Sequence, residues 1–285
     1  MIDPNHPNLN IQYIQKIIED VAAQEIIPRW KQLKDHEIQT KTGPSDLVTD
    51  ADIEAEKSLT AIFKQQFPGC GVIGEEAVSR GEINLQVMIQ NPPDILFVID
   101  PVDGTWNFAH DSETFACMVA CVYKGETVMS WIYDVPQKIC ATAEKGKGAF
   151  YGATQLKSAA PKLRADIEGY IGMGYLPRLI RSDIEDKVKE VSDVSTLRCA
   201  GHEYLNLARG KADFAIFSRT EPWDHLAGML LLQEAGGVSR RYDDQPYKIK
   251  DRRQVLLNAS SEEVWDDMHD LFIQPVMDKV GQPEP

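Results

Sequence analysis

A buried strand that runs directly into two carboxylates is the feature that most constrains this chain. The apolar run Ile95–Ile99 is typical of a strand covered on both faces, as in the interior of an α/β protein. Asp100 and Asp103 follow it, with a proline between them that stiffens the bend. Gly104 permits a tight turn, and Thr105 suits the start of a short helix, whose free amides favour an anion. The stretch offers oxygen ligands for a cation beside a cradle for a phosphate, although ordinary surface turns share its composition.

Three further segments place carboxylates where a helix or strand begins or ends. The segment 46–52 (DLVTDAD) leads into an expected helix, with Thr49 or Asp50 as its cap. Glu75 follows a second short strand, and the ends of strands are where α/β proteins gather ligands. Asp224 begins a later helix, where it can cap the helix or face a metal. Each segment also has an ordinary structural explanation, so none identifies a metal site alone.

The composition argues against several classes of protein. The net charge of −14 disfavours binding to a nucleic-acid backbone, which needs a basic face. Five cysteines without paired CxxC spacing argue against a disulfide framework or a zinc site. Residues 1–10 lack a signal-peptide pattern, and no apolar run has the length of a membrane span. We therefore expect a cytoplasmic protein without a membrane partner.

Hydrophobic periodicity predicts an α/β (α+β) fold in two halves. Residues 1–152 are expected to contain a helix over about 9–33, kinked at Pro28, then a second helix and an antiparallel meander over 116–142. Residues 153–285 are expected to alternate strands and helices. In that half we expect strands over 170–173, 214–217 and 255–258, and helices over 180–191, 203–209, 226–235 and 262–277. The first half would carry most metal ligands, and the second would carry Asp224 and the substrate rim.

Taken together, these segments resemble the inositol monophosphatase family of magnesium-dependent, lithium-sensitive phosphatases. Asp100–Phe108 (DPVDGTWNF) is similar to the family's DP[IL]DGTxNF signature. Trp223–Gly228 (WDHLAG) is similar to its WDxAAG signature, with Leu226 in place of an alanine. The segments DLVT with Asp52, and IGEE with Glu75, match its two other acidic motifs in the right order. The resemblance spans roughly residues 10–275.

The resemblance implies a layered αβαβα sandwich of the sugar-phosphatase type, usually found as a homodimer, with two to three Mg²⁺ ions per site. The implied ligands are Glu75, Asp100 and the Val102 carbonyl for the first ion, then Asp100, Asp103 and Asp224 for the second. Glu75 with water would hold a third. Independently of the family, a set made only of oxygens suits Mg²⁺ better than zinc or copper.

The resemblance also implies how water and substrate are held. Thr105 paired with Asp52 would activate the attacking water, and Glu75 would complete the catalytic set. Lys41 is either a phosphate contact or a solvated lysine. The implied substrate-binding residues are Asp103, Gly104, Thr105, Gly201, His202, Glu203, Phe217 and Asp224.

Two departures from the family pattern affect the leaving-group side. Phe217 stands seven residues before Asp224, where inositol-specific relatives have an acidic residue that binds sugar hydroxyls. A loop shift would instead bring Glu221 into the pocket. His202, Glu203 and Tyr204 stand where relatives have small residues. We therefore expect inositol 1-phosphate to be disfavoured, and a leaving group with an amine or aromatic surface to be favoured.

The leading hypothesis is a Mg²⁺-dependent phosphomonoesterase that hydrolyses an inositol monophosphate-like polyol or sugar phosphate with a metal-activated water. A 3′-phosphonucleotide phosphatase and a histidinol-phosphate phosphatase are alternatives. A protein that binds the transcription machinery and keeps residual activity is a third. Packed carboxylates repel one another and would destabilise an inactive protein, which argues against the last alternative.

Overall fold

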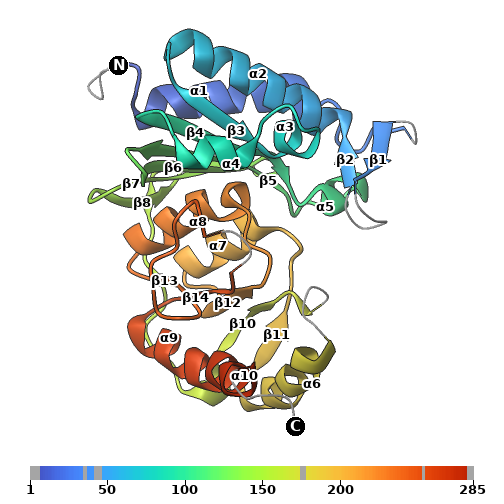
Figure 1. The fold of residues 1–285 in the computed structure, drawn as a ribbon. Coiled ribbons are helices and arrows are strands. Elements are labelled where there is room, and N and C mark those ends of the chain that lie inside the picture. The colour runs from blue at the N-terminus through green and yellow to red at the C-terminus, as the bar shows by residue number, and fades with distance from the viewer. Residues whose placement is uncertain (1–6, 35–36, 42–46, 174–177, 252–253, 281–285) are drawn as a thin grey trace.

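Five layers of helices and sheets alternate in the computed structural model (Figure 1). The structure describes residues 7–34, 37–41, 47–173, 178–251 and 254–280. The layers are, in order, a helical pair, a seven-stranded sheet, a second helical pair, a five-stranded sheet and a final helical layer. The expected αβαβα sandwich is therefore confirmed. Among the described residues, no helix has the length and hydropathy that a membrane crossing requires.

The first layer consists of α1 (Ile11–Val21), which continues as a π-helical turn over Ala22–Ile26, and α2 (Asp50–Gln66). The side chain of Asn10 caps α1 by accepting a hydrogen bond from the amide of Tyr13. The helix expected over 9–33 was too long, because regular helix ends at Ile26. Pro28 lacks an amide hydrogen and cannot continue the helical ladder, so the chain turns before it. A short hairpin of β1 (Ile38–Thr40) and β2 (Leu47–Thr49) connects α1 to α2.

The larger sheet has the strand order β3-β4-β5-β6-β7-β8-β9. Its strands are β3 (Gly71–Gly74), β4 (Ile95–Asp103), β5 (Ala116–Tyr123), β6 (Glu126–Asp134), β7 (Ile139–Glu144), β8 (Gly148–Tyr151) and β9 (Thr154–Gln155). β3 is parallel to β4, and every later pairing is antiparallel, which confirms the predicted meander. All nine residues of β4 are buried.

An irregularity in β4 shapes its end. The register with β5 shifts between Asp100 and Asp103, so the two intervening residues are outside the regular pairing. Such a bulge bends a strand and changes the direction of its side chains. Residues three apart in a regular strand point to opposite faces, whereas the extra residue of this bulge lets Asp100 and Asp103 both line one cavity. Three short helices flank this region: α3 (Glu75–Ser79), α4 (Leu85–Gln90) and α5 (Thr105–Ala109).

The middle layer contains α7 (Ala200–Ala208) and α8 (Pro222–Glu234), between the two sheets (Figure 1). Ten of the thirteen residues of α8 are buried, as expected for a helix covered on both sides. Gly228 of α8 faces the ring of Tyr204 on α7, and a Cβ at this position would lie 2.1 Å from the Tyr204 Cδ2 atom. The missing side chain of Gly228 therefore sets how closely the two helices pack.

The smaller sheet has the order β11-β10-β12-β14-β13 and carries the last helical layer. Its strands are β10 (Glu168–Ile171), β11 (Asp193–Ser195), β12 (Phe214–Phe217), β13 (Val238–Arg241) and β14 (Leu256–Ala259). The outer helices are α6 (Arg178–Lys187), α9 (Glu262–Met268) and α10 (Gln274–Val280). A π-helical turn over His269–Ile273 interrupts the single helix expected over 262–277. The division into halves at residue 152 stays a prediction.

Gly228→Ala should lower the free energy of unfolding by about 1–3 kcal/mol in urea titrations. Ala usually stabilises a helix by about 1 kcal/mol relative to Gly. Here the new methyl group would overlap Tyr204, which is fully buried, and overpacking of this kind outweighs the gain. Gln233→Ala, at an exposed position of the same helix, is the matched control. A more stable Gly228→Ala protein would contradict this account of the helix pair.

Candidate functional site

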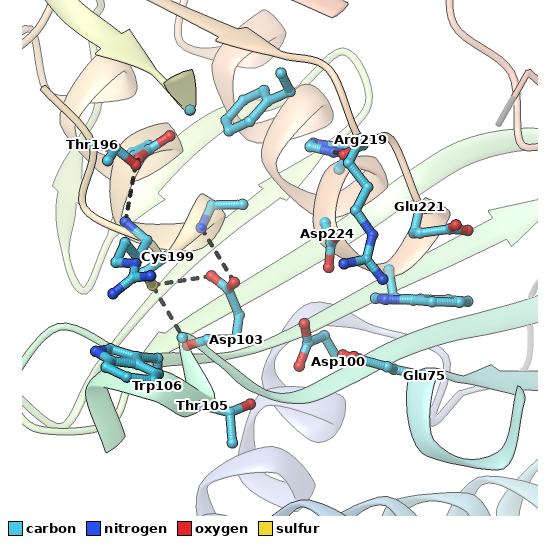
Figure 2. A pocket seen from close by; sticks show the side chains of 18 of the residues that line it. Glu75, Asp100, Asp103, Thr105, Trp106, Thr196, Cys199, Arg219, Glu221 and Asp224 are labelled. Atoms are coloured by element: carbon cyan, nitrogen blue, oxygen red, sulfur yellow. Dashed lines mark hydrogen bonds between the residues drawn. The ribbon is translucent and has the colours of Figure 1, made fainter. Parts of the chain in front are cut away.

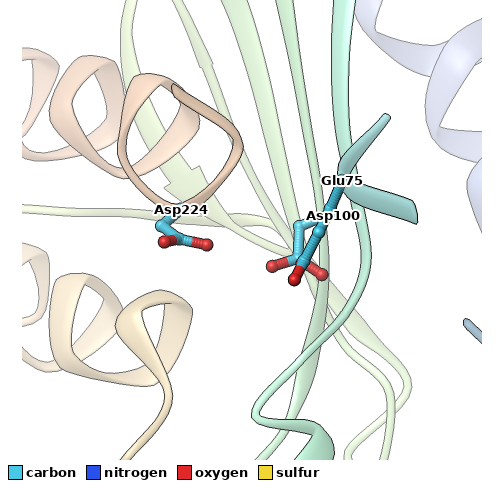
Figure 3. A group of neighbouring side chains, drawn as sticks. All are labelled: Glu75, Asp100 and Asp224. Carbon is cyan, nitrogen blue, oxygen red and sulfur yellow. The ribbon is translucent and has the colours of Figure 1, made fainter. Parts of the chain in front are cut away.

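Three carboxylates from separate elements meet at one point. Glu75 is the first residue of α3, Asp100 lies in β4, and Asp224 lies in the first turn of α8. Each offers a ligand atom, and these atoms all lie within 4.8 Å of one another. Figure 3 shows the three side chains turned toward a common space. The group therefore contains two predicted ligands from the first half of the chain, Glu75 and Asp100, and one from the second half, Asp224.

The electrostatics of this group fit a hard divalent cation. Burial raises the pKa of Asp100 well above its ordinary range, and the charges of Glu75, Asp103 and Asp224 raise it further. Burial, followed by the charges of Glu75 and Asp103, raises the pKa of Asp224 in the same way. Closely spaced oxygens that repel one another are the ligands that Mg²⁺ or Ca²⁺ prefers. These residues could therefore hold such an ion, each through one carboxylate oxygen.

Lys41 lies beside the three carboxylates. Its Nζ donates to Glu75 Oε1 at 2.8 Å and to Glu76 Oε1 at 2.6 Å, and its side chain is 9% exposed. Burial alone would lower the pKa of Lys41, but the charges of Glu75 and Glu76 outweigh burial and raise it. The structure thus shows a paired lysine instead of a solvated one. The neighbouring Asp46, part of the first acidic motif, lies outside the described residues.

Glu56 of α2 positions the chain around Glu75, and the sequence analysis missed it. Its carboxylate accepts hydrogen bonds from the amides of Glu76 and Ala77, each at 2.7 Å, at the start of α3. Burial raises the pKa of Glu56 to about 7. Spacing could have indicated Glu56, because it recurs with Asp52, Leu59 and Phe63 on the inward face of one helix.

Thr105 and Asp52 lie together, as predicted. Thr105 Oγ1 is 3.0 Å from Asp52 Oδ1 and 3.0 Å from the Val102 carbonyl oxygen. Asp52 also accepts the amide of Thr49 at 2.9 Å in a capping box, which connects the pair to the start of α2. Burial raises the pKa of Asp52 to about 6, although the hydrogen bonds from Thr49 oppose the shift. Gly104 has a φ of +88°, so the turn before Thr105 favours glycine.

Asp103 faces away from the three-carboxylate group, toward the start of α7 (Figure 2). Its carboxylate accepts the amides of Ala200 at 3.2 Å and Gly201 at 2.6 Å, together with the thiol of Cys199 at 3.0 Å. Nothing in the sequence indicated the contact with Cys199. The structure does not bring Asp103 together with the other ligands, and its role as a ligand stays a prediction.

A cavity of about 200 Å³ opens above the carboxylates. Its described lining contains six of the residues predicted to bind substrate: Asp103, Gly104, Thr105, Glu203, Phe217 and Asp224. Phe217 and Glu221 were predicted as alternatives for one position in the pocket, but both line the cavity. Sequence reasoning missed Trp106, Arg198 and Arg219, which also line it. Loop conformation places the two arginines, and no periodic pattern could have indicated it, whereas Trp106 lies in the short helix α5.

The sequence predicted a cavity rim of His202, Glu203 and Tyr204. This prediction is wrong for His202 and Tyr204, because α7 turns their side chains away from the cavity. His202 is outside the described lining, and its Nε2 lies 3.2 Å from the Phe115 carbonyl oxygen. Tyr204 is fully buried beneath Phe217, with ring centroids 5.4 Å apart. Glu203 reaches the cavity, but its Oε1 accepts the amide of Leu197 at 2.8 Å and the hydroxyl of Thr196 at 3.0 Å.

Comparisons with known proteins agree with this architecture. The model of the inositol monophosphatase family matches residues 10–278. An inositol-1-monophosphatase of Bacillus subtilis is 32% identical over 227 residues, covering 79% of this chain and 83% of that protein. A fructose-1,6-bisphosphatase/inositol-1-monophosphatase of Thermotoga maritima is 29% identical over 203 residues, covering 70% and 73%. The solved structure of a Thermotoga maritima IMPase superimposes with a TM-score of 0.80 at 23% identity, covering 95% of this chain and 98% of that one. The chain therefore belongs to the inositol monophosphatase family and is a phosphatase that acts on a phosphorylated metabolite.

Proposed function

We propose that this phosphatase depends on Mg²⁺ and hydrolyses small phosphomonoesters at the group formed by Glu75, Asp100 and Asp224. The observation that carries the proposal is the approach of these carboxylates to within 4.8 Å, beside the Thr105–Asp52 pair. When bound, two to three Mg²⁺ ions would offset the negative charge of the carboxylates, stabilise charge on the phosphate oxygens and make water a usable nucleophile near neutral pH.

The protein's own residues then have distinct tasks. Glu75, Asp100 and Asp224 hold the cations, with the Val102 carbonyl and Asp103 as the remaining predicted ligands. The hydroxyl of Thr105 orients the attacking water. Ionised Asp52 accepts the proton of that hydroxyl, which leaves the oxygen of Thr105 free to accept a proton from water.

The substrate we propose is a small phosphorylated polyol or sugar. Relatives named for inositol monophosphate and fructose 1,6-bisphosphate support this class. Phe217 cannot accept a hydrogen bond from a ring hydroxyl, but the carboxylate of Glu221, which also lines the cavity, can, so inositol 1-phosphate stays within the proposed class. The 3′-phosphonucleotide and histidinol-phosphate alternatives are tested by the same substrate panel. The homodimer, the cytoplasmic location and the sensitivity to lithium stay predictions.

Phosphate release should require Mg²⁺ and should stop when a chelator is added. Asp100→Asn should lower kcat by several orders of magnitude, because it removes a charged ligand at the centre of the group. Asp266→Asn, which changes an exposed aspartate on α9, should behave like the wild type. Full activity in chelator, or in Asp100→Asn, would contradict the proposed metal dependence.

Mg²⁺ should raise the melting temperature of the protein more at pH 8 than at pH 5. Because the pKa values of Asp100 and Asp224 are raised by folding, the folded protein binds more protons than the unfolded chain above pH ~4, and metal-free stability falls as pH rises. Cations need the deprotonated carboxylates, so their effect grows in the same direction. At a hundredfold excess over Kd the gain is about 2.7 kcal/mol. A melting temperature that Mg²⁺ leaves unchanged at pH 8 would count against the site.

Thr105→Ala should lower kcat by about 10²–10⁴ with little change in KM, the range expected when positioned acid–base help is lost. Thr105→Ser keeps the hydroxyl and should retain most of the activity. Steady-state kinetics at saturating Mg²⁺ distinguish the two variants. Normal kcat in Thr105→Ala would restrict Thr105 to a role in the turn before α5.

A further inference from the structure

Two arginines stand at the mouth of a cavity whose floor is acidic. Arg219 lies in the loop between β12 and α8, and Arg198 lies just before α7. Both are exposed, and both line the cavity. Figure 2 shows the side chain of Arg219 extending from its loop toward the side of the cavity that holds Asp224. These guanidinium groups replace the histidine and tyrosine rim that the sequence suggested.

The backbone of Arg219 is held from the buried core. His225 Nε2 lies 3.1 Å from the Arg219 carbonyl oxygen, and His225 Nδ1 lies 3.2 Å from the hydroxyl of Tyr204. A carbonyl oxygen can only accept a hydrogen bond, so Nε2 of His225 carries the proton. Its Nε2–H therefore donates to Arg219, and its Nδ1 accepts from Tyr204. Since His225 and Tyr204 are both buried, this hydrogen bond ties the loop backbone at Arg219 to the core.

The guanidinium of Arg219 has donors to spare. Within the described ranges it makes no ion pair within 4 Å and no side-chain hydrogen bond, and its positive charge opposes the rise in the pKa of Asp224. Arg198 differs, because its guanidinium carbon lies 4.7 Å from the centre of the Trp106 ring. Arg219 is therefore the cavity arginine better placed to bind a ligand.

We propose that Arg219 determines specificity by binding a second anionic group on the leaving-group side of the substrate. The group is a carboxylate or a second phosphate, either of which matches the fork of guanidinium donors. The substrate is then a phosphomonoester that carries a further negative charge. A leaving group with an amine, expected from the sequence, would be repelled by Arg219. This inference rests on the proposed phosphatase function and narrows its substrate class.

The test uses two matched substrate pairs with the Mg²⁺-loaded enzyme. 2-Phosphoglycerate and glycerol 2-phosphate differ by a carboxylate, whereas fructose 1,6-bisphosphate and fructose 1-phosphate differ by a phosphate. The wild type should prefer the anionic member of at least one pair by about 10- to 100-fold in kcat/KM, and Arg219→Met should abolish that preference. Arg219→Lys should keep part of it, because an ammonium binds without the fork. Arg209→Met, which removes the same charge beside Tyr151, is the control.

The outcomes separate this inference from the proposed function. The pair that shows the preference identifies the second group as a carboxylate or a phosphate. Hydrolysis of both members without a preference in the wild type overturns the role of Arg219 and leaves the phosphatase intact. An equal loss for both members in Arg219→Met overturns it too, because the arginine then acts on the shared phosphate. Release of phosphate from none of the four compounds overturns the proposed function, and this inference with it.

Discussion

Repulsion between closely spaced carboxylates, one buried and two half-buried, is the interaction on which the rest of this structure depends. Glu75, Asp100 and Asp224 come together only because each stands at the end of an element that the layers hold in place. β4 is buried along its whole length, and α8 is enclosed between two sheets, so neither can move away to relieve the repulsion. The fold therefore holds an unfavourable contact that a bound cation would relieve with little rearrangement.

Other buried carboxylates near the site accept hydrogen bonds from backbone amides. This difference separates carboxylates that connect elements from those that could bind a cation. Glu56 accepts two amides of α3, Asp52 accepts the amide of Thr49, and Asp103 accepts two amides of α7. Such groups connect neighbouring elements, because a hydrogen bond to a charged group is stronger than one between neutral groups. Among the residues that the structure describes, Asp100 accepts a hydrogen bond only from the amide of Val102, which is consistent with a ligand for a cation.

The sequence predicted the parts of the site that depend on local order. An apolar run followed by Asp100 indicates the end of a buried strand. After residue 115, apolar runs separated by turn residues predicted the meander. The sequence could not predict which face of a helix meets which neighbour. His202 and Tyr204 were expected at the cavity, but each residue of α7 is rotated by about 100° from the last, so a small error in helical phase moves a side chain from rim to core. Arg219 was missed because its loop has no period.

Tyr204 connects the packing of the core to the substrate side of the cavity. Tyr204 places a phenol ring in the core between α7 and α8, and Gly228 leaves the space that the ring fills. Once buried, the hydroxyl of Tyr204 needs a partner, which His225 provides, and the other nitrogen of His225 then holds the Arg219 carbonyl. Core packing is thus connected, through His225, to the backbone that carries a cavity arginine. The part of the cavity that would face the leaving group is therefore set by packing between α7 and α8, while the carboxylates beneath it are held by the strand and helix ends.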